Sequence, residues 1–281
     1  MSTVLVTGAR GRVARAVTAR LAATGHVVRA AGSVPTEITA PAGVETAELA
    51  LDRPETFEAA LRGVRQVFLY PEPAGITAFI RAAESAGVEH AVLLSSSTVT
   101  GPDAAADPLA GHSLRVEQAL TAAGVPSTFL RPDAFASNAL GWAPLAGRAL
   151  AVPLAYPDAE TAPIHPEDLA DLALDALTGG PLAGRSVTLT GPESLSFRTQ
   201  LAVLAEAGGH PIEIERVSRA EAEAQMSRYR PHTMVSALLD LWAAADGRPA
   251  TVHDTTATLL GRPARTFHQW ARENAAAFAP H

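Results

Sequence analysis

The chain has 281 residues, with no cysteine, no lysine, few aromatic residues and no apolar run of 18 residues or more. Without cysteine it has no disulfides, thiolate zinc sites, iron–sulfur ligation or cysteine nucleophile. All 22 basic residues are arginine. The missing lysine excludes Schiff-base chemistry, a phosphate-binding loop lysine and a catalytic tyrosine–lysine pair.

A surplus of positive charge is also missing, since the net charge is −7. This charge argues against nucleic acid as the main partner, because binding phosphates needs a basic surface. The lack of a long apolar run predicts no membrane span, and the first residues do not show the charged-then-apolar order of a signal peptide. We therefore expect a soluble, cytoplasmic protein that acts on a small molecule as a monomer or homodimer.

Hydrophobic residues make up 47% of the chain and charged residues 18%, enough apolar surface for a sizeable core. Short apolar runs alternate with helical patterns, which predicts an α/β fold with a Rossmann-type, doubly wound parallel sheet. The predicted strands are 3–6, 26–31, 44–49, 66–70, 90–94, 127–130, 186–189 and 211–217. The predicted helices are 13–24, 55–62 (capped near Asp52), 75–86, 111–123, 166–177, 197–207 and 218–229.

The regular alternation breaks after Pro132, and residues 133–163 contain four prolines and scattered aromatic residues. Such a segment is typical of a binding lid or a connector. We predict a dinucleotide-binding core over residues 1–132. Residues 133–281 are expected to hold the remaining core elements and a smaller C-terminal substrate-binding or lid subdomain, packed on the sheet edge without a clear linker.

A glycine loop joins the first strand to the first helix. Gly8 allows the tight turn out of the strand, and Gly11 lets backbone N–H groups approach a pyrophosphate at the helix N-terminus. Ala14 stands where a third glycine would permit close helix–strand packing, a mild departure. The pattern predicts a dinucleotide site, and the alternative is a glycine-rich turn without a ligand.

The residues after the second strand indicate NADP(H) rather than NAD(H). An NAD-type site places an acid there for the ribose hydroxyls, but no acid occurs before Glu37. Arg10 and Arg12 flank Gly11 and are expected to reach a 2′-phosphate, with Ser33 as a hydrogen-bond partner. For Arg12 the alternative is a solvated helix face.

The order of these and later motifs resembles the NmrA-like branch of the atypical short-chain dehydrogenases/reductases, over most of the chain. The matching segments are 7–11, 67–71, 87–96, 128–132 with Phe135 and Asn138, 165–170, 189–193, and 260–263 with Phe267. The family includes NADPH-dependent reductases of quinones and related acceptors, and cofactor-binding regulators. The resemblance implies that Val13, Tyr70, Pro71, Ser95 and Pro132 also face the cofactor. Asp52 or, equally, Ala50 takes the place of the family's acid near adenine.

Hydroxyl side chains follow the fifth strand, at the edge of the sheet where open α/β folds bind ligands. By resemblance, Ser96 takes the place of the superfamily's catalytic hydroxyl, although local capping would also explain this cluster. His112 is the candidate for proton transfer, and its alternative is a histidine facing water. Glu117 is expected to pair with Arg115 or a loop arginine.

Four residues of the irregular segment are candidates for an aromatic-accepting substrate pocket: Phe135, Asn138, Trp142 and Tyr156. The alternative for an aromatic residue in a long loop is a plug over the core. The nine histidines show no metal-ligand spacing, so we predict no metal site.

These features together predict an NADP(H)-dependent oxidoreductase that reduces a quinone or another conjugated or aromatic carbonyl compound. Without a tyrosine–lysine pair, the acceptor must delocalise the charge that hydride transfer creates. Two alternatives remain: an NADP-binding redox sensor without turnover, and a non-redox isomerase or cyclase that uses His112.

Overall fold

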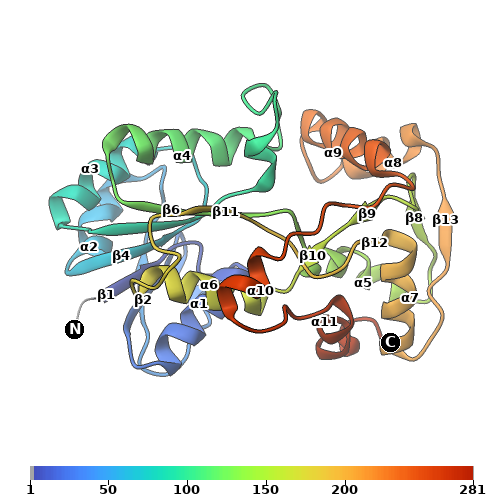
Figure 1. Ribbon diagram of the computed structural model, residues 1–281, viewed down its shortest axis with the longest axis horizontal. Coiled ribbons are helices and arrows are strands. Elements are labelled where there is room, and N and C mark those ends of the chain that lie inside the picture. The colour runs from blue at the N-terminus through green and yellow to red at the C-terminus, as the bar shows by residue number, and fades with distance from the viewer. Residues whose placement is uncertain (1–2, 281) are drawn as a thin grey trace.

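The computed structural model describes residues 3–280 and confirms the predicted doubly wound sheet (Figure 1). Seven parallel strands lie in the order β11-β6-β5-β4-β1-β2-β3. They are β1 (Thr3–Val6), β2 (Val27–Gly32), β3 (Glu45–Glu48), β4 (Val64–Leu69), β5 (His90–Leu94), β6 (Ser127–Pro132) and β11 (Ser186–Leu189). The strand order reverses between β1 and β4, so a ligand crevice is expected at their carboxyl ends.

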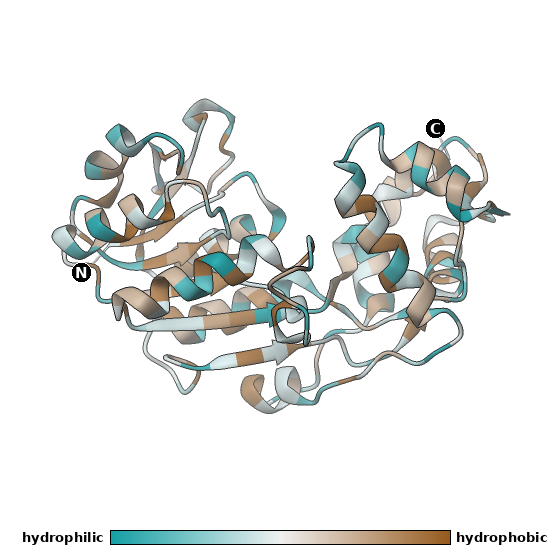
Figure 2. Ribbon diagram, turned by 90° about the horizontal axis from the view of Figure 1, so that it is seen from above, coloured by the Kyte–Doolittle hydropathy of each residue, from teal (hydrophilic) through white to brown (hydrophobic). Residues whose placement is uncertain are grey.

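Helices cover both faces of this sheet, and Figure 1 shows α3 and α4 on one side and α1 and α6 on the other. Apolar side chains fill one core under each layer, and in Figure 2 the strands carry brown, apolar segments. The flanking helices are α1 (Arg12–Ala23), α2 (Phe57–Leu61), α3 (Ile76–Ala86), α4 (Gly111–Ala123), α6 (Pro166–Leu177) and α10 (Thr255–Leu260). Within residues 3–280, no helix combines the length and the apolar character needed to span a membrane.

A smaller unit lies beyond the carboxyl ends of the strands, with a third apolar core of its own (Figure 1). The chain passes into or out of it after β6, before α6, after β11, before α10 and before α11. Its helices are α5 (Ala143–Ala146), α7 (Phe197–Gly208), α8 (Arg219–Met226), α9 (His232–Ala245) and α11 (Phe267–Glu273). Its short strands are β7 (Ala134–Phe135), β8 (Val152–Leu154), β9 (Glu160–Thr161), β10 (Pro163–Ile164), β12 (Leu195–Ser196) and β13 (Ile214–Arg216).

Short 3₁₀ turns complete the chain: η1 (Pro35–Glu37), η2 (Pro54–Thr56), η3 (Ser97–Thr100), η4 (Ala136–Gly141) and η5 (Ala275–Ala277). They account for one wrong prediction, the helix over residues 55–62. Pro54 opens the separate turn η2, and α2 starts only at Phe57, without a side-chain cap. Asp52 therefore does not cap this helix.

Two other predictions need correction. The strand expected over residues 211–217 is reduced to β13, which pairs only with β8, because this pair lies outside the main sheet. The C-terminal part does not pack along the sheet edge as a whole. Only α10 returns there, against α6 and the edge strand β11, because Leu259 and Leu260 are the apolar residues that join the core of the larger unit.

A buried carboxylate ties the C-terminal segment to α6. Asp168 is fully buried and accepts hydrogen bonds from Arg262 Nη2 at 2.8 Å, from the Arg265 backbone N–H at 2.7 Å and from the Arg265 guanidinium. Asp171, one turn on, accepts from both arginines at 2.6 and 3.0 Å and also pairs with Arg20 of α1 at 3.0 Å. The network therefore joins α1, α6 and the segment before α11.

His165 begins α6 and is also buried. Its Nδ1 accepts the N–H of Glu167 at 3.1 Å as the helix N-cap, and its Nε2 lies 3.1 Å from a Glu273 carboxylate oxygen on α11. Burial lowers the pKa of His165, against the opposing effects of Glu273 and Asp168. The neutral imidazole is thus the form that the fold stabilises.

We predict that Asp168→Ala lowers the free energy of unfolding by about 3–5 kcal/mol, because it leaves two guanidinium groups without their buried partner. Glu167→Ala is the matched control: it removes a half-exposed partner of Arg20 on the same helix and should cost about 0–1 kcal/mol. Urea denaturation at pH 7.5 measures both variants. Equal midpoints for the two would contradict the role given to Asp168.

We also predict that stability falls as the pH drops from 7 to 5. Below about pH 6.5 a histidine in the unfolded chain binds a proton, whereas buried His165, with its lowered pKa, stays neutral to a lower pH. The unfolded state therefore binds more protons than the folded state, and acid stabilises it relative to the folded state. His165→Asn keeps an oxygen to cap α6 but does not titrate, so its unfolding free energy should decline less steeply. Part of the slope should persist, because burial also lowers the pKa of His90. His232→Asn, at an exposed position, is the control and should match the wild type.

Candidate active site

The glycine loop has the geometry that a dinucleotide requires. Gly8 has a φ of +62°, and a Cβ at this position would lie 3.1 Å from the Cβ of Tyr70. The N–H of Gly11 donates to the Gly8 carbonyl at 2.8 Å, which closes the turn. No side chain caps the N-terminus of α1, so its first N–H groups are available to a phosphate.

A cavity of about 200 Å³ opens at the strand-order reversal, and we call it the switch-point cavity. It brings the predicted cofactor residues of α1 and β4 together with predicted substrate residues that follow β6. Its lining residues are Gly8, Gly11, Arg12, Val13, Ala14, Phe68, Tyr70, Leu94, Phe135, Ser137 and Asn138. Phe68, Leu94 and Ser137 were not predicted from the sequence, although Phe68 and Leu94 lie near the carboxyl ends of predicted strands.

Charged side chains surround the predicted 2′-phosphate position. Arg10 forms an ion pair with Glu37, which the turn η1 brings back from beyond β2. Arg53 donates to the Ser33 carbonyl at 3.2 Å and pairs with Glu48 at 2.7 Å. The corner therefore holds two acids and a third arginine that the sequence pattern did not indicate.

Asp52, Pro71 and Pro132 are predicted cofactor residues that do not line the switch-point cavity, as Arg10, Ser33 and Ser95 do not. Asp52 is exposed, whereas its alternative Ala50 is buried. The loop that contains Asp52 packs closely against Gly75. A Cβ added at Gly75 would lie 1.7 Å from the Leu51 carbonyl oxygen, so this contact requires glycine. Pro71 is half-buried after Tyr70, and Pro132 is buried at the end of β6.

The hydroxyl of Ser95 faces the interior rather than the switch-point cavity. Ser95 is buried and donates to Glu117 Oε1 at 2.5 Å. Glu117 is also buried and accepts from Arg131 at 3.0 and 2.6 Å in a bidentate pair. The predicted pairing of Glu117 with Arg115 or a loop arginine is therefore wrong: its partner lies on β6, and Arg115 donates to the Gly111 carbonyl.

The two candidate catalytic residues occupy the ends of neighbouring elements. Ser96 is half-buried and caps η3, where its Oγ lies 2.9 Å from Thr98 Oγ1 and accepts the Thr98 N–H at 3.3 Å. His112 is exposed in the first turn of α4. Neither side chain lines the switch-point cavity, so a role in catalysis requires the acceptor to extend toward the loop after β5.

Two predicted substrate residues belong to the core of the smaller unit. Trp142 packs edge-on against Phe197 at 5.7 Å between ring centroids, and Tyr156 joins the same apolar clusters. Both residues therefore fit the alternative given above, in which an aromatic residue of a long loop covers the core. Phe135 and Asn138 alone keep the predicted position beside the glycine loop.

Comparisons with known proteins agree with this geometry. A family model described as NAD(P)H-binding matches residues 8–179. A (4-alkanoyl-5-oxo-2,5-dihydrofuran-3-yl)methyl phosphate reductase from Streptomyces griseus is 39% identical over 285 residues, or 99% of each chain. An NAD(P)H azoreductase from Xenophilus azovorans is 32% identical over 84% of each chain.

Solved structures share the fold over nearly the full length. An NADPH-dependent quinone oxidoreductase from Escherichia coli superposes with a TM-score of 0.79 at 23% identity, covering 96% of this chain and 98% of that one. The predicted NAD(P)H-binding function is confirmed by the family model and by the two relatives above. The chain belongs to the NAD(P)H-binding family, and it is an NAD(P)H-dependent reductase.

Proposed function

We propose that this reductase transfers a hydride from NADPH to a conjugated carbonyl compound, such as an enone or a quinone. The observation that carries the proposal is the switch-point cavity, where the glycine loop meets side chains that follow β6. The loop and the uncapped N-terminus of α1 fit a dinucleotide pyrophosphate. Phe135, Ser137 and Asn138 are then left to hold an acceptor.

The side chains of the cavity suit an acceptor that spreads its charge. Bound NADPH would supply a hydride to the β-carbon of the acceptor, which would leave negative charge on the carbonyl oxygen. Asn138 and Ser137 line the cavity and provide hydrogen-bond donors for that oxygen, a stabilisation worth several kcal/mol in a dry site. Phe68 and Leu94 are buried side chains that keep water away. His112 or water returns a proton to the α-carbon.

Reduction of an isolated ketone is a poorer fit. It creates a localised alkoxide that needs a strong positioned acid, and a chain without lysine has no tyrosine–lysine pair. The one tyrosine of the switch-point cavity, Tyr70, lies against Gly8 on the side of the nucleotide loop. In a conjugated acceptor, delocalisation of the negative charge therefore takes the place of the positioned acid that the chain lacks.

The full-length relative supports this substrate class. Its name describes a dihydrofuranone ring whose remaining double bond lies between carbons 3 and 4, beside the ring 5-oxo group and an alkanoyl group. Such a bond is conjugated to two carbonyls. We propose an acceptor of this electronic type for the present chain.

The charges at the 2′-phosphate corner support NADPH over NADH. Arg10 and Arg12 flank the loop, and Arg53 lies against Ser33. Arg10 is paired with Glu37 in this structure, so a bound 2′-phosphate would replace Glu37 as the partner of Arg10. Three cations against two paired acids leave a net positive charge, which favours the phosphorylated ribose.

We predict that NADPH raises the melting temperature more than NADH does at equal concentration. A ligand at about 100 times its dissociation constant adds about 2.7 kcal/mol to stability. The double variant Arg10→Ala, Arg12→Ala should lose the difference between the two nucleotides but keep its response to NADH. Arg15→Ala, an exposed change on the same helix, is the control. Equal stabilisation of the wild type by both nucleotides would contradict the assignment of NADPH as the preferred cofactor.

We further predict turnover with quinones or enones and little with simple aliphatic ketones, measured as NADPH oxidation at 340 nm. Asn138→Ala removes a hydrogen-bond donor of the switch-point cavity and should lower kcat by about 100-fold, while the dissociation constant of NADPH changes little. His112→Ala should lower kcat, because it removes a proton donor, whereas His232→Ala, at an exposed position, should not. Full activity in the Asn138→Ala variant would place the chemistry elsewhere, and faster reduction of aliphatic ketones would refute the mechanism.

A further inference from the structure

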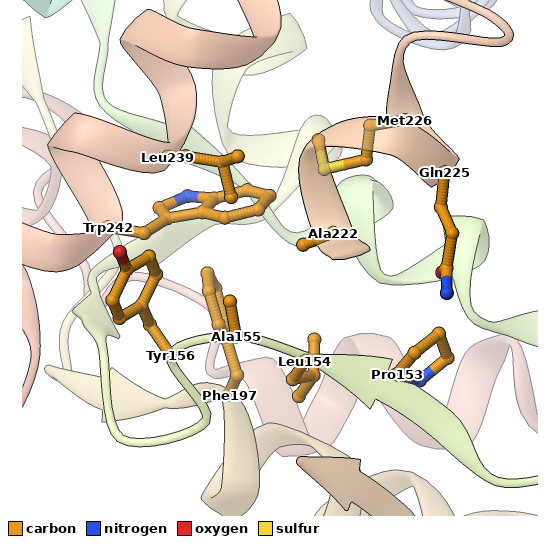
Figure 3. Close-up of a pocket in the computed structure, with 10 residues that line it drawn as sticks. All are labelled: Pro153, Leu154, Ala155, Tyr156, Phe197, Ala222, Gln225, Met226, Leu239 and Trp242. Atoms are coloured by element: carbon orange, nitrogen blue, oxygen red, sulfur yellow. The ribbon is translucent and has the colours of Figure 1, made fainter. Parts of the chain in front are cut away.

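The smaller unit contains a second, apolar cavity of about 40 Å³, which we call the tail pocket (Figure 3). Figure 3 shows its side chains converging from α8 and α9 on one side and from β8 on the other, with Gln225 and Pro153 at one end and Tyr156 with Trp242 at the opposite end. The complete lining is Pro153, Leu154, Ala155, Tyr156, Phe197, Ala222, Gln225, Met226, Leu239 and Trp242.

The lining of the tail pocket selects an uncharged, apolar group. No charged side chain contributes to it. The Tyr156 side chain is occupied by a hydrogen bond with Arg219, which raises the pKa of that arginine. Met226 is a flexible side chain that adapts to an inserted group. A void of this size and polarity accepts the last carbons of an alkyl chain.

A row of aromatic rings runs from the tail pocket to Trp142, the residue after η4. Ser137 and Asn138 line the switch-point cavity from η4, and Trp142 follows this turn directly. Trp142 stands edge-on to Phe197 at 5.7 Å, and Phe197 stands edge-on to Trp242 at 5.2 Å between ring centroids. Phe197 and Trp242 are walls of the tail pocket. Apolar rings in mutual contact therefore extend from the residue after η4 to this pocket.

We infer that the substrate carries an aliphatic tail, whose end occupies the tail pocket while its conjugated head lies in the switch-point cavity. The inference rests on the proposed function and adds a substrate class to it. Each methylene buried in the pocket should raise kcat/KM by about fourfold, which corresponds to about 0.8 kcal/mol.

A series of enones tests the tail directly: 3-penten-2-one, 3-octen-2-one and 3-undecen-2-one. The wild type should show kcat/KM at least about 10-fold higher for the eleven-carbon enone than for the eight-carbon one. Ala222→Leu fills the pocket from α8, and this ratio should fall toward one. Ala224→Leu places the same side chain at an exposed position of the same helix and should keep the wild-type ratio. Met226→Phe fills the pocket from a second position in case Ala222→Leu does not fold.

Binding without chemistry separates the two proposals. With no nucleotide present, 1-octanol should change the tryptophan emission at a concentration at least about 10-fold below that needed of 1-butanol. Trp242→Phe should lose the change, because Trp242 is the one tryptophan in the lining. Octanol binding without turnover of any enone would overturn the proposed function but support the pocket. Turnover without dependence on chain length, together with no effect of octanol, would overturn the tail pocket and leave the proposed function standing.

Discussion

A carboxylate removed from water sets the relative position of the two units of this protein. Burying a charge costs several kcal/mol unless donors surround it, and Asp168 meets that condition through a backbone N–H and two guanidinium groups. These donors all come from residues 262–265, nearly one hundred positions away. The segment before α11 must therefore dock against α6 whenever Asp168 is buried. A guanidinium suits the task better than an ammonium, because its planar fork serves Asp168 and Asp171 together.

The same ion network reaches the nucleotide side. Arg20 lies in the last turns of α1, the helix whose N-terminus faces the switch-point cavity, and it pairs with Glu167 and Asp171 of α6. On the far side of α6, His165 contacts Glu273 of α11. The glycine loop and the core of the smaller unit are thus fixed to one helix. This common reference explains how η4 can hold Ser137 and Asn138 at a defined place beside Gly8.

The parts of the structure that follow from local chemistry were predictable. Two helices and two strands match their predicted bounds: 111–123, 166–177, 90–94 and 186–189. In each of them the spacing of apolar residues is compatible with only one type of secondary structure. Gly8 and Gly11 meet Phe135 and Asn138 because parallel strands gather their carboxyl ends at one edge. Trp142 and Tyr156 were misplaced for the opposite reason. Their surroundings come from Phe197 and Trp242, and no local pattern specifies such distant partners.

Charge pairs show the same limit. The pattern around Glu117 pointed to Arg115 or a loop arginine, yet its partner Arg131 lies on β6 and its partner Ser95 directly follows β5. A buried carboxylate takes whichever donors the packing supplies, so its partner depends on how α4 crosses the sheet. Glu37 likewise reaches Arg10 only because Pro35 starts a 3₁₀ turn after β2.

The repeated passage of the chain between the two units limits how such an enzyme can be recombined. A single cut after β6 would not release a substrate-binding module, since α6, β11 and α10 return to the larger unit. An exchange of specificity between relatives would instead need three segments transplanted together: residues 133–163, 190–252 and 266–280. New substrate ranges are therefore reached more simply by side-chain replacement inside a fixed frame than by shuffling of modules.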